Sequence, residues 1–318
     1  LLISLLVIFG VSATWVSATQ LSKYSLDFDP DTFKAPFFML WFSTTWMVTC
    51  FPAFLIYNMF RRTSVKESFK ASTPILGGSF FRGFGRVLLF LVLWTGANYS
   101  YSISLTLVSA SIATSISSCN AAFVWILAML LLGDKFMVPK LLAVFFAIGG
   151  VVLISLDGQL NAPWQGIVLA VVSALLTAIY KVLFKYIIGD ATLGQVSLFM
   201  TCLGALNLAL NTIPTFLLIG FNVEYLDVTT LPWWPLVGSA LLGLMFNFLI
   251  NFGIALLHPL VISVGMLVGI PLNTVIDILF SAVSATVLFI CGSVCIVFSF
   301  ILVVFPYSLV PFCRKIPF

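Results

Sequence analysis

The chain is a succession of long apolar stretches separated by short polar turns. Ten stretches have the length, about 20 residues, that an α-helix needs to cross a bilayer. They cover approximately residues 1–19, 36–60, 86–106, 109–133, 138–156, 164–188, 195–220, 233–257, 259–280 and 284–306. We therefore predict an all-α membrane protein with ten transmembrane helices.

The order of these stretches divides naturally into five and five. The separator, residues 156–164, contains Asp-Gly and Asn-Ala-Pro, which are turn signals. An odd number of spans in each half means that the second half inserts upside down relative to the first. We predict two inverted five-helix repeats, residues 1–157 and 158–318, the arrangement of many alternating-access carriers.

Asparagines in the two halves support this division. Asn98 and Asn120 have the same spacing in the first half as Asn251 and Asn273 have in the second. Short matches of this kind arise by chance, but these occur in the same order along the chain. They are typical of a duplicated membrane protein.

Composition narrows the class of protein. Hydrophobic residues make up 62% of the chain and charged residues 8%, which is more apolar surface than a soluble domain of this length can bury. No stretch is long or polar enough to form a basic soluble domain, so we expect no nucleic-acid partner. The six cysteines lack metal-ligand spacing, and we expect no metal and no cofactor.

The basic residues predict the orientation. If the N-terminus is cytoplasmic, only Lys23 and Lys34 lie on the opposite side of the membrane. The other basic residues lie toward the cytoplasm, as the positive-inside rule requires. We expect both termini to be cytoplasmic, in the plasma membrane or an endomembrane such as the Golgi or endolysosomal membrane. The chain begins at Leu1 rather than Met, and we expect a segment to precede it.

The stretch from Phe246 to Asp277 carries unusual polar residues for an apolar region. Asn247 with Asn251, and Asn273 with Asp277, are pairs four residues apart, so each pair lies on one helix face. Polar groups are costly in hydrocarbon and mark candidate functional sites. We predict that the asparagines contact substrate and that Asp277 provides charge compensation or proton coupling; the alternative is an interfacial acid.

Lys181 and Lys185 are a second candidate pair, four residues apart near the end of one predicted span. Long basic side chains in such positions often snorkel to the membrane surface. If they face inward instead, they form a site for phosphate or carboxylate groups. This pair favours an anionic substrate.

Further candidates are aromatic, hydroxyl and amide side chains within the predicted spans. Packing is one role for them, and contact with a flat heterocycle or a cation is the other. They are Trp41, Ser43, Thr44, Trp46, Asn98, Tyr99, Tyr101 and Asn120.

Catalysis in the membrane is not expected. It normally requires two converging acids, a Ser and His arrangement or a metal cluster. The chain contains a single histidine, His258, and Asp277 is its only acidic residue inside an apolar segment.

Several motifs resemble a known family. Residues 35–44, Tyr180-Lys-Val-Leu-Phe-Lys185, Asn251-Phe-Gly-Ile-Ala255 and residues 270–277 are similar to the F subfamily of solute carrier family 35. More narrowly, they resemble its thiamine transporter-like members. The resemblance implies the ten-helix inverted-repeat fold of the drug/metabolite transporter superfamily, and transport of a small molecule.

The leading hypothesis from the sequence is an alternating-access carrier for thiamine or a related cationic heteroaromatic metabolite. Substrate contacts would come from the candidates above, Lys181 included. One alternative is an antiporter of nucleotide sugars or other anionic metabolites, which the wider family implies and the lysines favour. The other is a receptor or scaffold that transports nothing.

Overall fold

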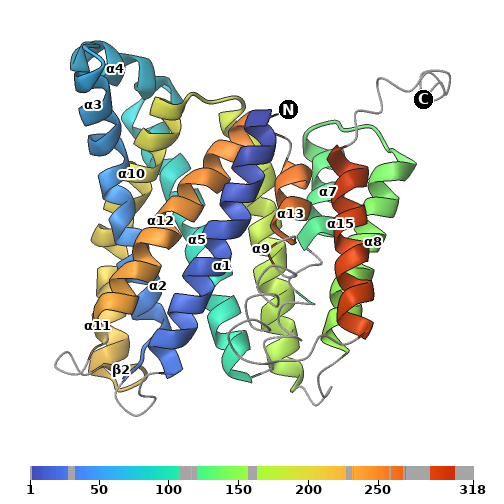
Figure 1. The fold of residues 1–318 in the computed structure, drawn as a ribbon. Helices are drawn as coiled ribbons and strands as arrows, with labels where there is room; N and C mark the ends of the chain where they lie inside the picture. Colours follow the sequence, from blue (N-terminus) through green and yellow to red (C-terminus); the bar gives the residue numbers. More distant parts are fainter. Residues whose placement is uncertain are drawn as a thin grey trace.

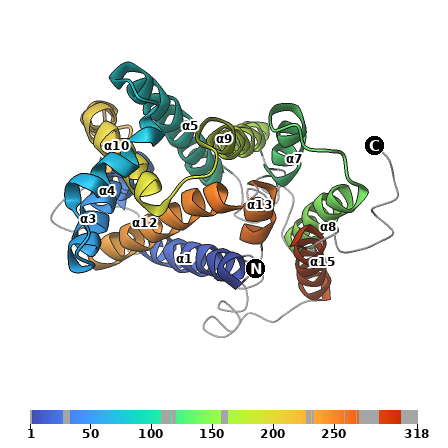
Figure 2. The same cartoon turned by 90° about the horizontal axis from the view of Figure 1, so that it is seen from above.

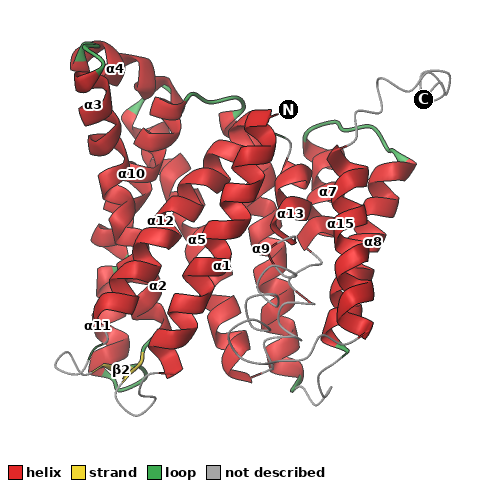
Figure 3. Ribbon diagram, viewed as in Figure 1, coloured by secondary structure: helices red, strands yellow, loops and turns green. Residues whose placement is uncertain are grey.

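The computed structural model describes residues 2–27, 33–107, 116, 120–156, 163–226, 231, 233–257, 259–267, 269 and 287–304. Nearly all of them are helical (Figure 3). The long helices lie alongside one another in a bundle, which Figure 1 shows from the side and Figure 2 from above. The predicted all-α class of protein is confirmed.

Helices occur in each of the ten predicted apolar stretches. They are α1 (Leu2–Asp27), α2 (Pro36–Thr45), η1 (Trp46–Thr49), α3 (Cys50–Phe60), α4 (Val65–Ser72), η2 (Thr73–Leu76), α5 (Phe80–Leu107), α7 (Asn120–Leu131), α8 (Val138–Ser155), α9 (Trp164–Ile188), α10 (Leu193–Leu210), α11 (Thr212–Gly220), α12 (Trp233–Leu256), α13 (Pro259–Leu267) and α15 (Val287–Val304). Two short strands, β1 (Phe33–Lys34) and β2 (Tyr225–Leu226), pair antiparallel.

Among the residues that the structure describes, five helical stretches are long and apolar enough to cross a membrane, judged by length and composition. They are Pro36–Phe60, Phe80–Ser104, Trp164–Ile188, Leu193–Gly220 and Trp233–Leu256. Shorter apolar helices cover Leu6–Ala18, Asn120–Leu131, Val138–Leu153 and Ile290–Ser299. The chain is thus a helical membrane protein, while ten spans and an inverted repeat stay predictions.

Small residues and hydroxyl groups bring the helices close together. The Ser104 hydroxyl of α5 donates to the Gly166 carbonyl of α9 over 2.8 Å, and Ser299 of α15 donates to Ala143 of α8 over 2.6 Å. A Cβ atom at Gly150 of α8 would lie 2.6 Å from the carbonyl oxygen of Gly292. Close backbone approach of this kind is the usual basis of helix association in lipid.

The stretch predicted as the second span is interrupted by the 3-10 turn η1 between α2 and α3. Pro52 has no N–H, so the carbonyl of Val48 loses its helical donor. The Thr201 hydroxyl of α10 supplies a replacement, 3.1 Å from the Val48 oxygen, and it also accepts a hydrogen bond from the Phe51 N–H over 2.9 Å. Helix α10 therefore braces the interruption.

Gly204 permits this contact. A Cβ atom there would lie 2.7 Å from the Val48 nitrogen and 3.0 Å from the Met47 carbonyl carbon. Both are backbone atoms, which cannot move aside as the end of a flexible side chain can. Only glycine fits between α10 and η1 without displacing one of them.

Gly204→Val is therefore expected to destabilise the protein by roughly 1–3 kcal/mol through overpacking. The measurement is the apparent Tm of purified protein in detergent. The control is Gly243→Ala in α12, where an added Cβ meets no atom within 4 Å, so its Tm should stay within a degree or two of wild type or rise. Equal Tm values for the two variants would show that α10 does not closely contact η1.

Glu224, the residue that precedes β2, links that part of the chain to α2. In Figure 1, β2 lies at the opposite end of the molecule from α4. The Glu224 carboxylate oxygens accept hydrogen bonds from Phe37 N–H at 2.7 Å and Phe38 N–H at 3.2 Å, in the first turn of α2. The N-cap residue, Ala35, has no side chain that could accept them. Glu224 is only 3% exposed, and this burial raises the pKa of its carboxyl, against the effect of the two backbone N–H groups.

The pH dependence of stability tests this arrangement. Because the pKa of Glu224 is higher in the folded protein, the wild type should gain stability as pH falls from 7 through that folded value, with the gain complete below the unfolded pKa. Glu224→Gln cannot titrate and lacks this gain. The difference in apparent Tm between the two proteins should therefore widen in favour of wild type on acidification; parallel Tm curves would contradict the assignment.

Candidate functional site

A cavity of about 160 Å³ lies among six helices that come from both halves of the chain. Its walls are mostly apolar and aromatic, with a few amide, hydroxyl and amino groups. The lining residues are Trp15 (α1), Trp94, Ala97, Asn98 and Tyr101 (α5), Asn120 (α7), Ser173, Ala174, Thr177, Tyr180 and Lys181 (α9), Phe246 and Ile250 (α12), and Ser263, Met266 and Leu267 (α13).

Lys181 is the charged residue of this lining and is only 2% exposed. Its Nζ donates to Ser263 Oγ at 3.0 Å, and lies 3.4 Å from both Asn120 Oδ1 and Met266 Sδ. All three acceptors are uncharged. Within the part of the chain that the structure describes, the ion pairs are Lys140 with Asp134 and Lys185 with Asp190, so Lys181 has no carboxylate partner there.

A polar stripe on α9 delivers Lys181 to the cavity. Ser173, Thr177 and Lys181 follow at intervals of four, with Tyr180 beside them, on a helix that is otherwise strongly apolar. Residues four apart lie on one helix face. This spacing therefore presents the polar groups of α9 to the same cavity.

Tyr180 is held by a second buried polar group. Its hydroxyl donates to Asn251 Oδ1 of α12 over 2.6 Å, while Asn251 Nδ2 donates to the Asn247 carbonyl oxygen over 2.8 Å. The Tyr180 ring also contacts Phe90 and Trp94, with centroids 5.3 and 5.8 Å away. This network sets the position of one aromatic wall of the cavity.

Helix α5 packs against α9 and forms the adjoining wall. Trp94 Nε1 donates to Thr44 Oγ1 at 3.3 Å, and Asn98 Nδ2 donates to the Trp94 carbonyl oxygen at 2.8 Å. These bonds hold the indole ring and the amide in defined orientations. The cavity thus combines aromatic walls of defined orientation with a buried lysine amino group.

Four of the predicted substrate-binding residues are brought together here: Asn98, Tyr101, Asn120 and Lys181. Asn251 lies behind the lining and supports Tyr180. Asn247 is buried, and its Oδ1 has no hydrogen-bond partner among the described residues. Asn273 and Asp277 lie outside the described residues.

The other predicted residues lie away from this lining. Trp41 Nε1 donates to Thr212 Oγ1 at 3.0 Å, Ser43 bonds the Leu40 carbonyl, and Trp46 packs on Phe42. Thr44 is buried behind Trp94, and Tyr99 packs edge-on against Phe37 with centroids 5.0 Å apart. Contacts of α2 with α5, α10 and α11 set these orientations, which spacing along one helix cannot reveal.

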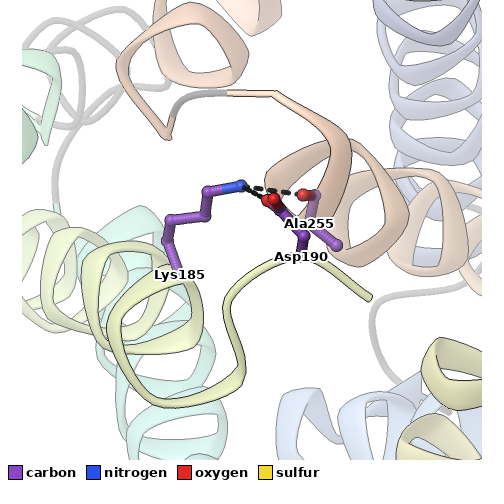
Figure 4. A network of polar contacts seen from close by, with 3 residues as sticks. All are labelled: Lys185, Asp190 and Ala255. Atoms are coloured by element: carbon purple, nitrogen blue, oxygen red, sulfur yellow. Dashed lines mark hydrogen bonds and ion pairs between the residues drawn. The ribbon is translucent and has the colours of Figure 1, made fainter. Parts of the chain in front are cut away.

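Lys185 differs from Lys181 although it lies one turn away. Its Nζ donates to the Ala255 carbonyl oxygen at 2.8 Å and to Asp190 Oδ1 (Figure 4). The bond from Lys185 lowers the pKa of the exposed Asp190 carboxyl. Lys185 therefore ties the end of α9 to α12 instead of lining the cavity.

The sequence interpretation missed several lining residues, among them Trp15, Trp94, Thr177, Ser263 and Met266. The four-residue interval of Ser173, Thr177 and Lys181 was a signal that could have found part of the set. Trp15 and Met266 are ordinary residues of apolar segments and carried no such signal. Within the described residues, no group of three His, Cys, Asp or Glu side chains could hold a metal ion.

The fold and this cavity define a class: a helical membrane protein with a small internal cavity whose mostly apolar walls carry a few polar groups. No family model matches the chain. Mouse solute carrier family 35 member F3 is 34% identical over 279 residues, 85% of this chain and 65% of that protein. Human member F4 is 34% identical over 310 residues, 95% of this chain and 59% of its own length.

The chain belongs to the F subfamily of solute carrier family 35, which confirms the resemblance seen in the sequence. It spans less than two thirds of the length of each of these relatives, 65% of the first and 59% of the second. A crystal structure of another protein matches with a TM-score of 0.66, covering 95% of this chain and 96% of that one. At 14% identity this match shows the fold alone.

The Tyr180 and Asn251 pair can be tested by a double-mutant cycle. Asn251→Leu leaves the buried Tyr180 hydroxyl without its acceptor and should cost about 1–3 kcal/mol of stability. Tyr180→Phe alone should cost less, and the double variant should be more stable than the sum of the two losses predicts. Apparent Tm values in detergent measure the cycle, and strictly additive losses would contradict the bond.

Proposed function

We propose that this protein is a solute transporter and that its substrate crosses the membrane through the cavity around Lys181. The observation that carries the proposal is a buried lysine amino group inside an aromatic chamber, contacted only by uncharged acceptors among the described residues. The relatives, named as solute carriers, support transport over catalysis. Helices of both halves line the chamber, which suits two inverted five-helix repeats that open it alternately to each side.

The size of the chamber supports an alternating mechanism. Ligand pockets for drug-sized molecules usually measure about 300–1,000 Å³, whereas this one measures about 160 Å³. A heteroaromatic metabolite needs more room than that. We infer that the described state is contracted and that the halves separate when substrate enters.

The first candidate substrate is a heteroaromatic metabolite that carries an anionic group. A charge buried in apolar surroundings is expensive unless it is paired with an opposite charge. A phosphate or carboxylate at Lys181 would supply that partner, while the rings of Trp94 and Tyr180 would hold the flat heterocycle. Nucleotide sugars and other anionic metabolites belong to this class, so the geometry reverses the order of preference that the sequence suggested.

The second candidate is thiamine or a related cation, and the aromatic walls favour it. Trp15, Trp94, Tyr101 and Tyr180 offer ring faces for a cation–π contact. A protonated Lys181 would repel such a substrate. The site would then hold either a proton on Lys181 or the cation, so that transport would exchange one for the other. Asp277 is the further candidate for charge compensation or proton coupling.

One pair of variants separates these candidates in liposomes. Lys181→Met keeps the length of the side chain but removes its charge, while Lys185→Gln alters a lysine outside the cavity. For an anionic substrate, uptake of members of a nucleotide-sugar and carboxylate panel should fall more than about thirtyfold in Lys181→Met. Lys185→Gln should keep uptake within a few fold of wild type.

For thiamine, Lys181→Met should still transport but should lose the response of wild-type uptake to a pH gradient. If Lys181→Met matches wild type for every transported solute and at every pH, the site has been wrongly assigned. If folded wild-type protein moves no solute of either panel, the result would favour a receptor or scaffold over a transporter.

A further inference from the structure

An open groove of about 880 Å³ lies on the outer side of α5 and α10, apart from the Lys181 cavity. It is bounded by η2, by the first two turns of α5 and by one face of α10. Its lining is largely apolar and includes Pro74, Leu76, Phe80, Phe84, Val87 and Leu206. The groove is therefore suited to a hydrocarbon chain.

The spacing of residues in α5 builds one wall. Phe80, Gly83, Phe84 and Val87 follow the three- and four-residue intervals of a single helix face. A Cβ atom at Gly83 would lie 3.1 Å from both the Cβ and the carbonyl oxygen of Leu76, so the glycine lets η2 approach α5 closely. Phe80 is 81% exposed, which leaves a large apolar side chain at the mouth of the groove.

The segment that contains η2 and the start of α5 is rich in basic residues, and one of them lies beside the groove. Residues 61–86 contain six basic side chains and a single acidic one. The Arg86 guanidinium donates to the Ile75 carbonyl over 3.1 Å and lies against Gly77, which holds it between η2 and α5. Arg82, one turn earlier on α5, is exposed.

We propose that this groove binds an anionic phospholipid, with an acyl chain along the apolar lining and the phosphate at Arg86. The charge lies in the right place for such a lipid, because the Arg86 guanidinium lies beside η2 at the end of a span, where headgroup and acyl chain meet. Helix α4 also fits a membrane surface, because it exposes Phe69 together with Lys66 and Lys70. The occupant is one lipid in a defined groove and not a diffuse layer around the basic residues.

Lipid binding to the purified full chain tests the proposal by native mass spectrometry, with dioleoyl phosphatidylglycerol and dioleoyl phosphatidylcholine as probes. Wild type should bind one phosphatidylglycerol more tightly than phosphatidylcholine. Arg82→Gln with Arg86→Gln should weaken phosphatidylglycerol binding about thirtyfold. Ala205→Phe, which fills the groove from α10 without altering charge, should weaken binding of both lipids.

Arg61→Gln with Lys66→Gln is the matched control, since it removes two charges from the same basic segment but leaves the groove lining unchanged. It should keep phosphatidylglycerol binding within a few fold of wild type. Arg82→Gln alone, which alters the side of α5 opposite the groove and spares Arg86, should also keep phosphatidylglycerol binding within a few fold of wild type. Equal weakening by the control pair, no effect of Ala205→Phe, or equally tight binding of sn-glycerol 3-phosphate would each overturn the proposal.

Discussion

The central physical constraint in this protein is the buried amino group of Lys181. The residue is 2% exposed, and its described contacts are an amide oxygen, a hydroxyl and a thioether. Three helices must therefore meet with their acceptors in register: α9 brings the lysine, α7 brings Asn120, and α13 brings Ser263 and Met266. These uncharged contacts satisfy hydrogen bonds of the amino group, but no carboxylate among the described residues offsets its charge when it is protonated.

Hydrogen bonds fix α9, which carries this group, against α12, whereas the helical stretch formed by α2 and α3 is interrupted. Tyr180 is tied to Asn251 of α12, and Lys185 ties the end of α9 to the same helix. By contrast, α2 and α3 are separated by a 3-10 turn whose lost hydrogen bond is replaced by Thr201. Such turns within a longer helix often mark hinges. In the proposed transport cycle, the contacts around α9 suit a part that stays rigid, and the interruption near α10 suits a part that bends.

The sequence predicted what depends on local pattern and composition. Apolar stretches predicted the helices, and Asn98, Asn120 and Lys181 stood out because polar groups in hydrocarbon require a reason. Spacing did not predict helix rotation: Trp41 and Tyr99 turn toward Thr212 and Phe37 because of packing between distant segments. It also did not separate Lys181 from Lys185, which share a helix face and differ only in depth and in the partners that other segments supply.

A structure of the protein with its transported solute bound tests the account most directly. The solute would be the one that the uptake panels identify, and the structure would be determined by electron cryo-microscopy in a lipid nanodisc. The solute should lie in the cavity against Trp94 and Tyr180, with Lys181 Nζ contacting it directly and the bonds of Lys181 to Asn120 and Ser263 rearranged. A transported solute bound away from this cavity, with the contacts of Lys181 unchanged, would contradict it.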